Sequence, residues 1–355
     1  MGKKFAFLVH PRNTLRSDMG ELFGAPFAMV PDAVWSGIFR ILPIPPQVTG
    51  RLSYGDTPTE TSGFIITVPF TPKQLISLPR GKVQSRISWA VDMARDAGAE
   101  IVGLGALTAP ASAGGKTLAK RSDVGITNGN AFTAAMTLRG IERLMARTKA
   151  DPLIAFVGAT GSVGSCLVEL FSRKHSGRVL LVGRNLGRTE RLATRIRRDD
   201  LQVLSSVDMS DVVQADIVVL LTSAAEALLR SEHLKKGAFV LDDTVPRNTD
   251  RRLLQERPDV VIVDGGLVQI PGARLRGPIG LPKGLAYACL AETMLLALEG
   301  HEGHFSIGTP SVEQAEFMMN AASRHPQIGF DLAPFRSFGK LLSDDAHTGD
   351  VTCAA

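Results

Sequence analysis

Three glycines near the middle of the chain have the spacing of a phosphate-binding loop. Gly158, Gly161 and Gly164 follow the apolar run 153–157 and precede a helical pattern that continues through Leu170. A strand, a tight glycine turn and a helix let backbone amides approach a pyrophosphate at the N-terminus of that helix. We therefore expect a dinucleotide site here. The alternative is that the glycines only allow the helix to pack closely against the strand.

The segments after this loop repeat the strand pattern of a Rossmann fold. Further apolar runs that predict strands lie at residues 178–183, 201–205, 215–221, 237–243 and 259–266. We expect additional cofactor contacts from residues between the glycines and from one residue after the run 215–221. These residues are Thr160, Ser162, Val163 and Ser223.

The end of the second predicted strand indicates which dinucleotide binds. Arg184 stands where an NAD-specific fold offers an acidic residue to the ribose, and Asn185 and Arg188 lie close by in the sequence. A guanidinium binds a 2′-phosphate through charge-assisted hydrogen bonds, whereas a carboxylate would repel it. We therefore expect NADPH, held in part by these three residues. The alternative is that the arginines only solvate the helix that follows.

A cysteine lies in the apolar segment GLAYACLAETMLLALEG, residues 284–300. Helical spacing places Cys289 on the less apolar stripe of a helix, together with Glu292. Pro282 and Gly284 predict the helix start, which leaves the thiol in the first two turns, where the helix dipole favours a thiolate. These residues alone favour an unreactive core cysteine over a nucleophile, because cysteine is among the most buried residue types.

Composition narrows the class of protein. The chain is 44% apolar and 21% charged with a formal net charge of +5, which is typical of a globular protein with a mild preference for acidic or phosphate-bearing partners. Cys166, Cys289 and Cys353 are too scattered to be a disulfide framework. The apolar stretch 23–46 is interrupted by prolines and charges. We expect a cytoplasmic protein with no transmembrane segment, no metal site and no nucleic-acid partner.

The pattern predicts an α/β fold with two lobes. Residues 1–150 alternate strand-like and helix-like segments and form the expected N-terminal α/β substrate domain. Residues 151–283 are the expected Rossmann NADP-binding domain. Residues 284–355 are expected to form a catalytic helix and a C-terminal return segment, with the helix returning across the cleft between the lobes.

Several segments carry a family resemblance. They are GLGALTA (103–109), ITNGNAFTAA (126–135), GATGSVGS (158–165), DGG (264–266) and ACLAETMLLALEG with HFS (288–306). In this order they resemble the cyanobacterial-type long-chain acyl-[acyl-carrier-protein] reductases, which are NADPH-dependent and form fatty aldehydes. The resemblance covers residues 64–308 and is most specific in its last block.

The resemblance implies a role for Cys289 as the nucleophile that accepts the acyl group from an acyl thioester. It implies an acyl carrier protein, or coenzyme A, as the acyl donor, and an enzyme that consumes the aldehyde product as a second partner. An acidic carrier protein would match the arginine-rich helix predicted at 184–198. Hydride from NADPH would then release the aldehyde.

Other side chains are candidates for supporting roles in this chemistry. An oxyanion needs hydrogen-bond donors, and we consider Asn128, Asn130 and the amides of the glycine-rich connection; the alternative for the asparagines is a helix-capping turn. Glu292, one turn from the thiol, could orient it or transfer a proton, although an exposed helix charge is the commoner role. His301 and His304 are candidate acids, although surface histidines after a helix are ordinary.

Two other functions fit parts of the pattern. A shikimate-type dehydrogenase has two α/β lobes with the nucleotide domain second, and TVPFTPK (67–73) faintly resembles its substrate motif, although the lysine spacing differs. A non-catalytic NADP sensor would keep the fold without the chemistry, and fold alone does not exclude it.

Overall fold

The computed structural model divides the chain into two compact units built from interleaved segments. It describes residues 2–11, 15–55, 61–224, 227–277 and 279–343. Unit 1 consists of Met1–Gly129, Gln269–Gly308 and Asn320–Phe330. Unit 2 consists of Asn130–Val268, Thr309–Met319 and Asp331–Ala355.

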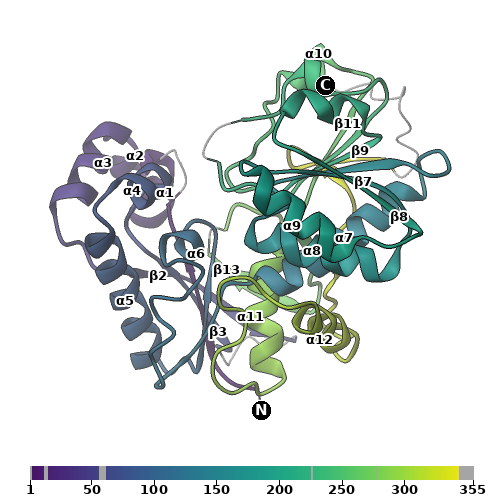
Figure 1. Cartoon of the computed structure of the whole chain (residues 1–355). Coiled ribbons are helices and arrows are strands. Elements are labelled where there is room, and N and C mark those ends of the chain that lie inside the picture. Colours follow the sequence, from purple (N-terminus) through teal and green to yellow (C-terminus); the bar gives the residue numbers. More distant parts are fainter. Residues whose placement is uncertain (1, 12–14, 56–60, 225–226, 278, 344–355) are drawn as a thin grey trace. The chain divides into compact units, whose positions relative to one another are not determined.

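A six-stranded mixed sheet is the centre of unit 1, with strand order β13-β2-β3-β1-β4-β5 (Figure 1). The strands β3, β1, β4 and β5 run parallel, whereas β2 pairs antiparallel with both β3 and β13. The bounds are β1 (Phe5–Val9), β2 (Gln47–Tyr54), β3 (Gly63–Thr67), β4 (Ile101–Leu104), β5 (Gly125–Thr127) and β13 (Ala273–Arg276). The short strand β14 (Leu285–Tyr287) also lies in unit 1.

Helices cover both faces of this sheet. The long helix α5 (Arg80–Asp96) buries Val83, Ile87 and Ala90 at helical spacing against Leu8 of β1. The short helices α4 (Pro72–Ser77) and α6 (Thr108–Ala111) contact each other, and α6 also contacts α5. Helix α11 (Ala288–Leu298) packs against β4 and β1. It approaches so closely that a Cβ placed on Gly103 would lie 2.0 Å from Oγ1 of Thr293.

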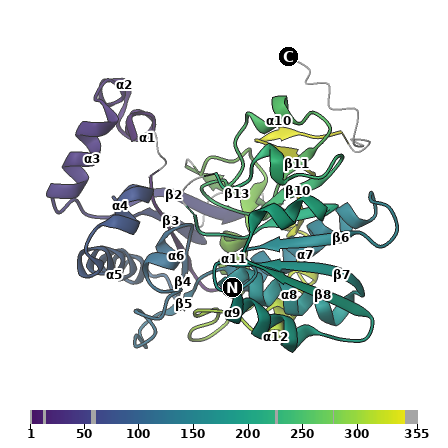
Figure 2. The ribbon, with the colours of Figure 1, turned by 45° about the horizontal axis from the view of Figure 1, so that its top comes forward.

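Three short helices form a separate group within unit 1, as Figure 2 shows. They are α1 (Leu15–Phe23), α2 (Ala25–Ala28) and α3 (Asp32–Ile41). The apolar stretch 23–46 therefore contains helices of only a few turns, because Pro31 precedes α3 and extended backbone follows at Leu42. Across the described residues, no helix combines the length and the apolar character needed to cross a bilayer.

Unit 2 contains a fully parallel sheet with the order β11-β10-β9-β6-β7-β8 (Figure 1). Numbered along the chain within the unit, this is the order 6-5-4-1-2-3 of the doubly wound dinucleotide-binding fold. The bounds are β6 (Leu153–Val157), β7 (Gly177–Val182), β8 (Leu201–Ser206), β9 (Ile217–Leu220), β10 (Phe239–Asp242) and β11 (Val261–Asp264). The predicted Rossmann fold is thus confirmed, and all six predicted strands are present.

Helices α7 (Asn130–Met145), α8 (Ser162–Lys174) and α9 (Leu186–Ile196) form a layer on one face of the parallel sheet (Figure 2). The short elements η1 (Met209–Gln214) and α10 (Leu253–Glu256) contribute Val212 and Leu253 to the core of the sheet, and η2 (Ser231–His233) contacts η1. The remaining elements lie at or near the points where the chain changes unit. They are β12 (Leu267–Gln269), α12 (Val312–Ser323), β15 (Asp331–Leu332), β16 (Arg336–Ser337) and β17 (Lys340–Leu341).

The predicted domain ranges 1–150, 151–283 and 284–355 differ from the two units in a way that packing explains. Helix α7 packs against α8, β9 and β10, so the first change of unit falls after Gly129 instead of residue 150. The chain does return after the Rossmann strands, but α11 is an integral part of unit 1. The segment 284–355 is therefore divided between both units.

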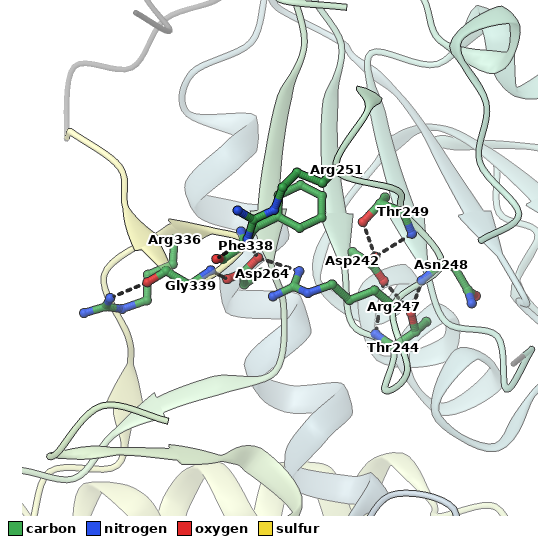
Figure 3. Close-up of polar contacts among 10 residues, drawn as sticks. All are labelled: Asp242, Thr244, Arg247, Asn248, Thr249, Arg251, Asp264, Arg336, Phe338 and Gly339. Carbon is green, nitrogen blue, oxygen red and sulfur yellow. Dashed lines mark hydrogen bonds and ion pairs between the residues drawn. The ribbon is translucent and has the colours of Figure 1, made fainter. Parts of the chain in front are cut away.

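Carboxylates at the ends of β10 and β11 hold the neighbouring loops in place (Figure 3). Asp242 accepts hydrogen bonds from the backbone amides and hydroxyls of Thr244 and Thr249. Asp264 accepts from the amides of Phe338 and Gly339 at 2.8 and 2.7 Å. Asp264 also pairs with Arg247 at 2.6 Å, and the guanidinium lies over the Phe338 ring. The C-terminal hairpin is thereby fastened to β11.

We expect Asp264→Ala to lower the stability of unit 2 by about 2–4 kcal/mol, because three donors lose a largely buried acceptor. Thermal unfolding followed by circular dichroism measures this change. Asp199→Ala, which removes an exposed carboxylate of the same unit, is the matched control. Equal melting temperatures for the two variants would contradict the proposed fastening of the hairpin.

Candidate functional site

The glycine loop of unit 2 lies at the point where the strand order reverses. Gly158 directly follows β6, and a Cβ placed on it would lie 2.9 Å from the carbonyl carbon of Leu221, at the end of the neighbouring strand β9. Its φ of +89° is also a left-handed value that favours glycine. A crevice at the carboxyl ends of the strands on either side of such a reversal is where doubly wound sheets bind dinucleotides.

The other two glycines permit the close approach of the loop to the helix. A Cβ on Gly164 would lie 2.4 Å from the carbonyl oxygen of Gly158, and one on Gly161 would lie 3.1 Å from the same atom. Helix α8 begins directly after Gly161, so Ser162, Val163 and Gly164 form its first turn. The amides of a first turn have no acceptor within the helix and can receive a phosphate. Thr160 lies close to Gly183, at the end of β7.

The three residues predicted to select NADP surround the start of α9. Arg184 is exposed two residues after β7, and Arg188 is exposed on the first turn of the helix. Asn185 is the N-cap residue, and its side chain accepts the Arg188 amide at 2.9 Å. Asn185 therefore has a structural role that the sequence interpretation did not give it. The arginines remain available for a 2′-phosphate.

Two further predicted residues lie in unit 2 near this loop. Ser223 is exposed after the carboxyl end of β9, where the reversal places the crevice. Asn130 begins α7, and its side-chain amide donates to the Ser162 hydroxyl at 2.7 Å. Asn130 thus contacts the first turn of α8, a contact that no sequence pattern indicated.

The helix that carries Cys289 begins later than predicted. Residues 285–287 form the strand β14, and α11 starts at Ala288, so Cys289 is the second residue of the helix and lies in its first turn. The helix dipole acts most strongly at this position. Between 288 and 297, all of which the structure describes, Cys289 alone is not buried. Cys289 is therefore a partly exposed residue in a helix that, apart from Leu298 at its end, is otherwise buried.

Gly129 lies directly against Cys289. A Cβ placed on Gly129 would be 2.2 Å from Cβ of Cys289 and 2.5 Å from its Cα, so no side chain fits there. The φ of +77° at Gly129 adds a second reason for glycine. The predicted turn before α7 is present, and the structure adds that it contacts the first turn of α11.

Neighbouring bonds hold this turn in place. The Asn128 amide nitrogen donates to Ser306 O at 2.9 Å, and its side chain donates to the carbonyls of Gly308 at 2.9 Å and Gly114 at 3.1 Å. Both hydrogens of its side-chain amide are thus used within the fold. The suggestion of Asn128 as an oxyanion donor is not supported, because these bonds give it a structural role.

Glu292 is fully buried, so the alternative of an exposed helix charge is wrong. Its carboxylate accepts a hydrogen bond from the hydroxyl of Thr127, the last residue of β5. Thr127 also accepts the amide of Ser306 at 3.3 Å. The bond therefore joins α11, one turn after Cys289, to the strand that leads into Gly129.

The remaining candidates have structural bonds. His304 accepts the Ile126 amide at 3.1 Å through Nδ1, and its Nε2 lies 3.2 Å from the Ala119 carbonyl. Nε2 of His301 lies 3.3 Å from the His304 carbonyl. The thiol of Cys166 is buried within α8, 3.5 Å from the Ser311 carbonyl. Cys353 lies outside the described residues.

Comparisons with known proteins agree with the fold of unit 2. The family described as shikimate / quinate 5-dehydrogenase matches residues 119–264, which contain the whole parallel sheet. The match does not reach 67–73, where Thr71 caps α4 and Pro72 is its first residue. The segment that faintly resembled a shikimate substrate motif thus runs from the end of β3 to the first two residues of α4.

Three curated relatives are similar to the chain at low identity. "Aminotransferase PigE" of Serratia sp. is 25% identical over 288 residues, covering 79% of this chain and 33% of the relative. The long-chain acyl-[acyl-carrier-protein] reductase of Synechococcus elongatus is 28% identical over 214 residues, covering 56% of this chain and 60% of the relative. A glutamyl-tRNA reductase of Trichodesmium erythraeum is 28% identical over 127 residues, covering 33% of this chain and 29% of the relative.

The chain thus spans a third of the length of the first relative and three fifths of the second. Together with the strand order and the glycine loop, these likenesses support an oxidoreductase that uses a nicotinamide dinucleotide. They confirm the predicted class of cofactor. The preference for NADP depends on the exposed arginines after β7.

Arg184→Asp tests that preference. We expect the apparent KM for NADPH to rise at least tenfold, by an estimate of about 1.4 kcal/mol or more for a lost charge-assisted contact, while the KM for NADH changes little. Steady-state kinetics with both nucleotides measures the effect. Arg191→Asp, on an exposed position further along α9, is the control for a general loss of positive charge. Equal changes in the KM for NADPH and for NADH would contradict the assignment of Arg184 to the 2′-phosphate.

Gly129→Ala tests the contact between the turn and α11. The added methyl group has no space and meets a left-handed φ, so we expect the first turn of α11 to shift and the alkylation rate of Cys289 by iodoacetamide to change severalfold. Mass spectrometry after timed labelling measures this rate. Gly81→Ala in α5, where a Cβ has nothing within 4 Å, is the control. An unchanged rate in Gly129→Ala would show that the contact does not affect the thiol.

Proposed function

We propose that the protein reduces a long-chain fatty acyl thioester to the fatty aldehyde through an acyl group carried on Cys289. The observation that carries the proposal is the position of this thiol. Cys289 lies in the first turn of α11, is partly exposed within a largely buried helix, and has the backbone of Gly129 against it. The likeness to an acyl-[acyl-carrier-protein] reductase over 56% of the chain supports the choice of substrate.

The first step is acyl transfer. The thiolate of Cys289 attacks the thioester carbonyl, and the resulting oxyanion collapses to expel the carrier thiolate, which takes up a proton. The first-turn amides of α11 and the positive end of its dipole stabilise both the thiolate and this oxyanion. These backbone donors replace Asn128 in the role that the sequence suggested for its side chain.

The second step is reduction of the acyl-cysteine. When bound, NADPH supplies the hydride for the thioester carbonyl. The same α11 amides stabilise the new oxyanion, whose collapse to a carbonyl needs no proton. Cleavage of the carbon–sulfur bond then frees the aldehyde and restores the Cys289 thiolate.

Two of the predicted catalytic residues act as positioning residues in this proposal. Glu292 holds Thr127, and through it the turn at Gly129, in fixed register with the helix that carries Cys289. Asn130 orients Ser162 in the first turn of α8, where the pyrophosphate is expected. Neither residue needs to touch the substrate to affect the rate.

The acyl donor in this proposal is an acidic acyl carrier protein, and the exposed arginines of α9 offer the charge that it would meet. Part of this charge is already neutralised, because Arg195 pairs with Glu169 at 2.5 Å. Coenzyme A is the other possible donor, and an enzyme that consumes the aldehyde remains a prediction.

Acylation of Cys289 can be tested directly. Incubation with palmitoyl-carrier protein or palmitoyl-CoA, without nucleotide, should add one palmitoyl group to Cys289, visible by mass spectrometry. Addition of NADPH should then remove it and yield palmitaldehyde. We expect Cys289→Ala to lower kcat/KM by a factor of about 1000 or more, because the nucleophile is lost.

Cys166→Ala is the matched control, since it removes a buried cysteine of unit 2. It should keep both the adduct and the activity. Aldehyde formation that survives Cys289→Ala would refute the covalent route. Binding of NADPH without any adduct would favour a sensor, whereas oxidation of a hydroxy acid with NADP⁺ would favour a dehydrogenase.

A further inference from the structure

Asp243 is an acidic residue of unit 2 that the proposed chemistry does not use. It directly follows β10, at the carboxyl end of the parallel sheet, and is only partly exposed. One carboxyl oxygen, Oδ2, lies 2.6 Å from the Thr137 hydroxyl in α7. The other, Oδ1, lies against the backbone of Gly266, where a Cβ would be 2.2 Å away. Both oxygens are therefore enclosed by neighbouring elements.

The hydrogen bonds around Thr137 fit a protonated Asp243. The Thr137 hydroxyl lies 2.7 Å from the Thr133 carbonyl as well as 2.6 Å from Asp243. A hydroxyl has one hydrogen, and a carbonyl oxygen only accepts. Both contacts are hydrogen bonds at the same time when Thr137 donates to Thr133 and Asp243 donates its own proton to Thr137. If Asp243 were ionised, the Thr137 hydroxyl would donate its hydrogen to Asp243, and the contact with the Thr133 carbonyl would no longer be a hydrogen bond.

The electrostatic surroundings also favour the protonated form of Asp243. Burial is the main cause that raises the pKa of Asp243, a hydrogen bond donated by Thr137 to the ionised carboxylate lowers it, and the charge of Asp242 raises it; the net pKa is about 7. Asp242 accepts hydrogen bonds from Thr244 and Thr249 (Figure 3). Asp243 therefore gains or loses its proton close to neutral pH.

The strand order places Asp243 on one half of the expected dinucleotide site. Arg184 follows β7, on one side of the reversal between β6 and β9, and marks the half that binds the adenosine. The nicotinamide half then lies over the carboxyl ends of β9 and β10. Ser223 and Asp243 follow those two strands.

We propose that Asp243 distinguishes oxidised from reduced cofactor by the charge of the nicotinamide ring. The ring of NADP⁺ is cationic, whereas that of NADPH is neutral. A cation near Asp243 stabilises its carboxylate, so NADP⁺ binds with release of the Asp243 proton to solvent, and NADPH binds while the proton stays. Neutral Asp243 thus favours NADPH over NADP⁺. This proposal rests on the cofactor of the proposed function but is independent of acyl transfer.

Equilibrium binding tests the proposal without any turnover. Dissociation constants for NADP⁺ and NADPH are measured by calorimetry between about pH 6 and about pH 8. If the ionised form binds NADP⁺ preferentially, the affinity for NADP⁺ should rise three- to tenfold over this range, since the upper limit for one proton and a pKa near 7 is about tenfold. The affinity for NADPH should change less than about twofold. Calorimetry in buffers of different ionisation enthalpy should also detect proton release with NADP⁺ alone.

Substitutions locate the effect. Asp243→Asn should remove the pH dependence of NADP⁺ binding and most of the proton release. Thr137→Val, which leaves the carboxyl in place but removes its partner, should keep the pH dependence and displace its midpoint. Asp199→Asn, at an exposed position before β8 and so at the opposite edge of the sheet, is the control and should behave as the unmodified protein.

Three results would overturn the proposal. One is an equal pH dependence for both nucleotides, and another is a pH dependence that survives Asp243→Asn. The third is a loss of affinity for both nucleotides at every pH, with a lower melting temperature, which would assign Asp243 a packing role only. If neither nucleotide bound at all, the cofactor assignment would fail together with this proposal. Failure of the Cys289 acylation test would leave the nucleotide measurements unaffected.

Discussion

The close approach of Gly129 to Cys289 is the constraint on which the candidate site depends. No side chain fits between the turn and the first turn of α11, and the bond from Thr127 to the buried Glu292 joins the same two elements one helical turn further on. A buried carboxylate without a partner would be costly, so strand and helix are expected to keep this register. The thiol therefore has a fixed position on a rigid helix, whereas catalytic groups on loops need other means of orientation.

Much of unit 2 could be predicted because its signals are local. Apart from the edge strand β8, each strand contains a continuous apolar run, as expected for a parallel sheet buried on both faces, and the glycine triplet lies between the first strand and its helix. Arg184 could be proposed as a contact to the 2′-phosphate because that prediction depends only on its position after the second strand. The start of α11 was predicted four residues too early, since the short strand β14 carries no pattern that separates it from a helix.

Residues whose roles depend on distant partners could not be assigned from the sequence. The side chain of Asn128 is bonded to Gly308, 180 positions away, and Glu292 to Thr127, 165 positions away. Periodicity within one helix does not show such contacts, so the sequence left Asn128 as either an oxyanion donor or part of a capping turn, and Glu292 as either a catalytic group or an exposed charge. The interleaving of the two units has the same origin. Helix α11 belongs to unit 1, where Thr293 packs closely against Gly103 of β4. Such a contact between distant segments cannot be read from either segment alone.

Asp242 and Asp243 show how the fold gives adjacent identical residues different surroundings. Side chains alternate along a strand end, so Asp242 reaches the donors of the following loop, whereas Asp243 is enclosed by α7 and Gly266. Asp242 accepts four hydrogen bonds, and its negative charge raises the pKa of the neighbouring Asp243. Hydride transfer converts a neutral nicotinamide ring into a cation. Asp243 lies on the half of the site expected to hold that ring and can lose its proton near neutral pH. Its charge can therefore change with that of the ring, without any movement of the backbone.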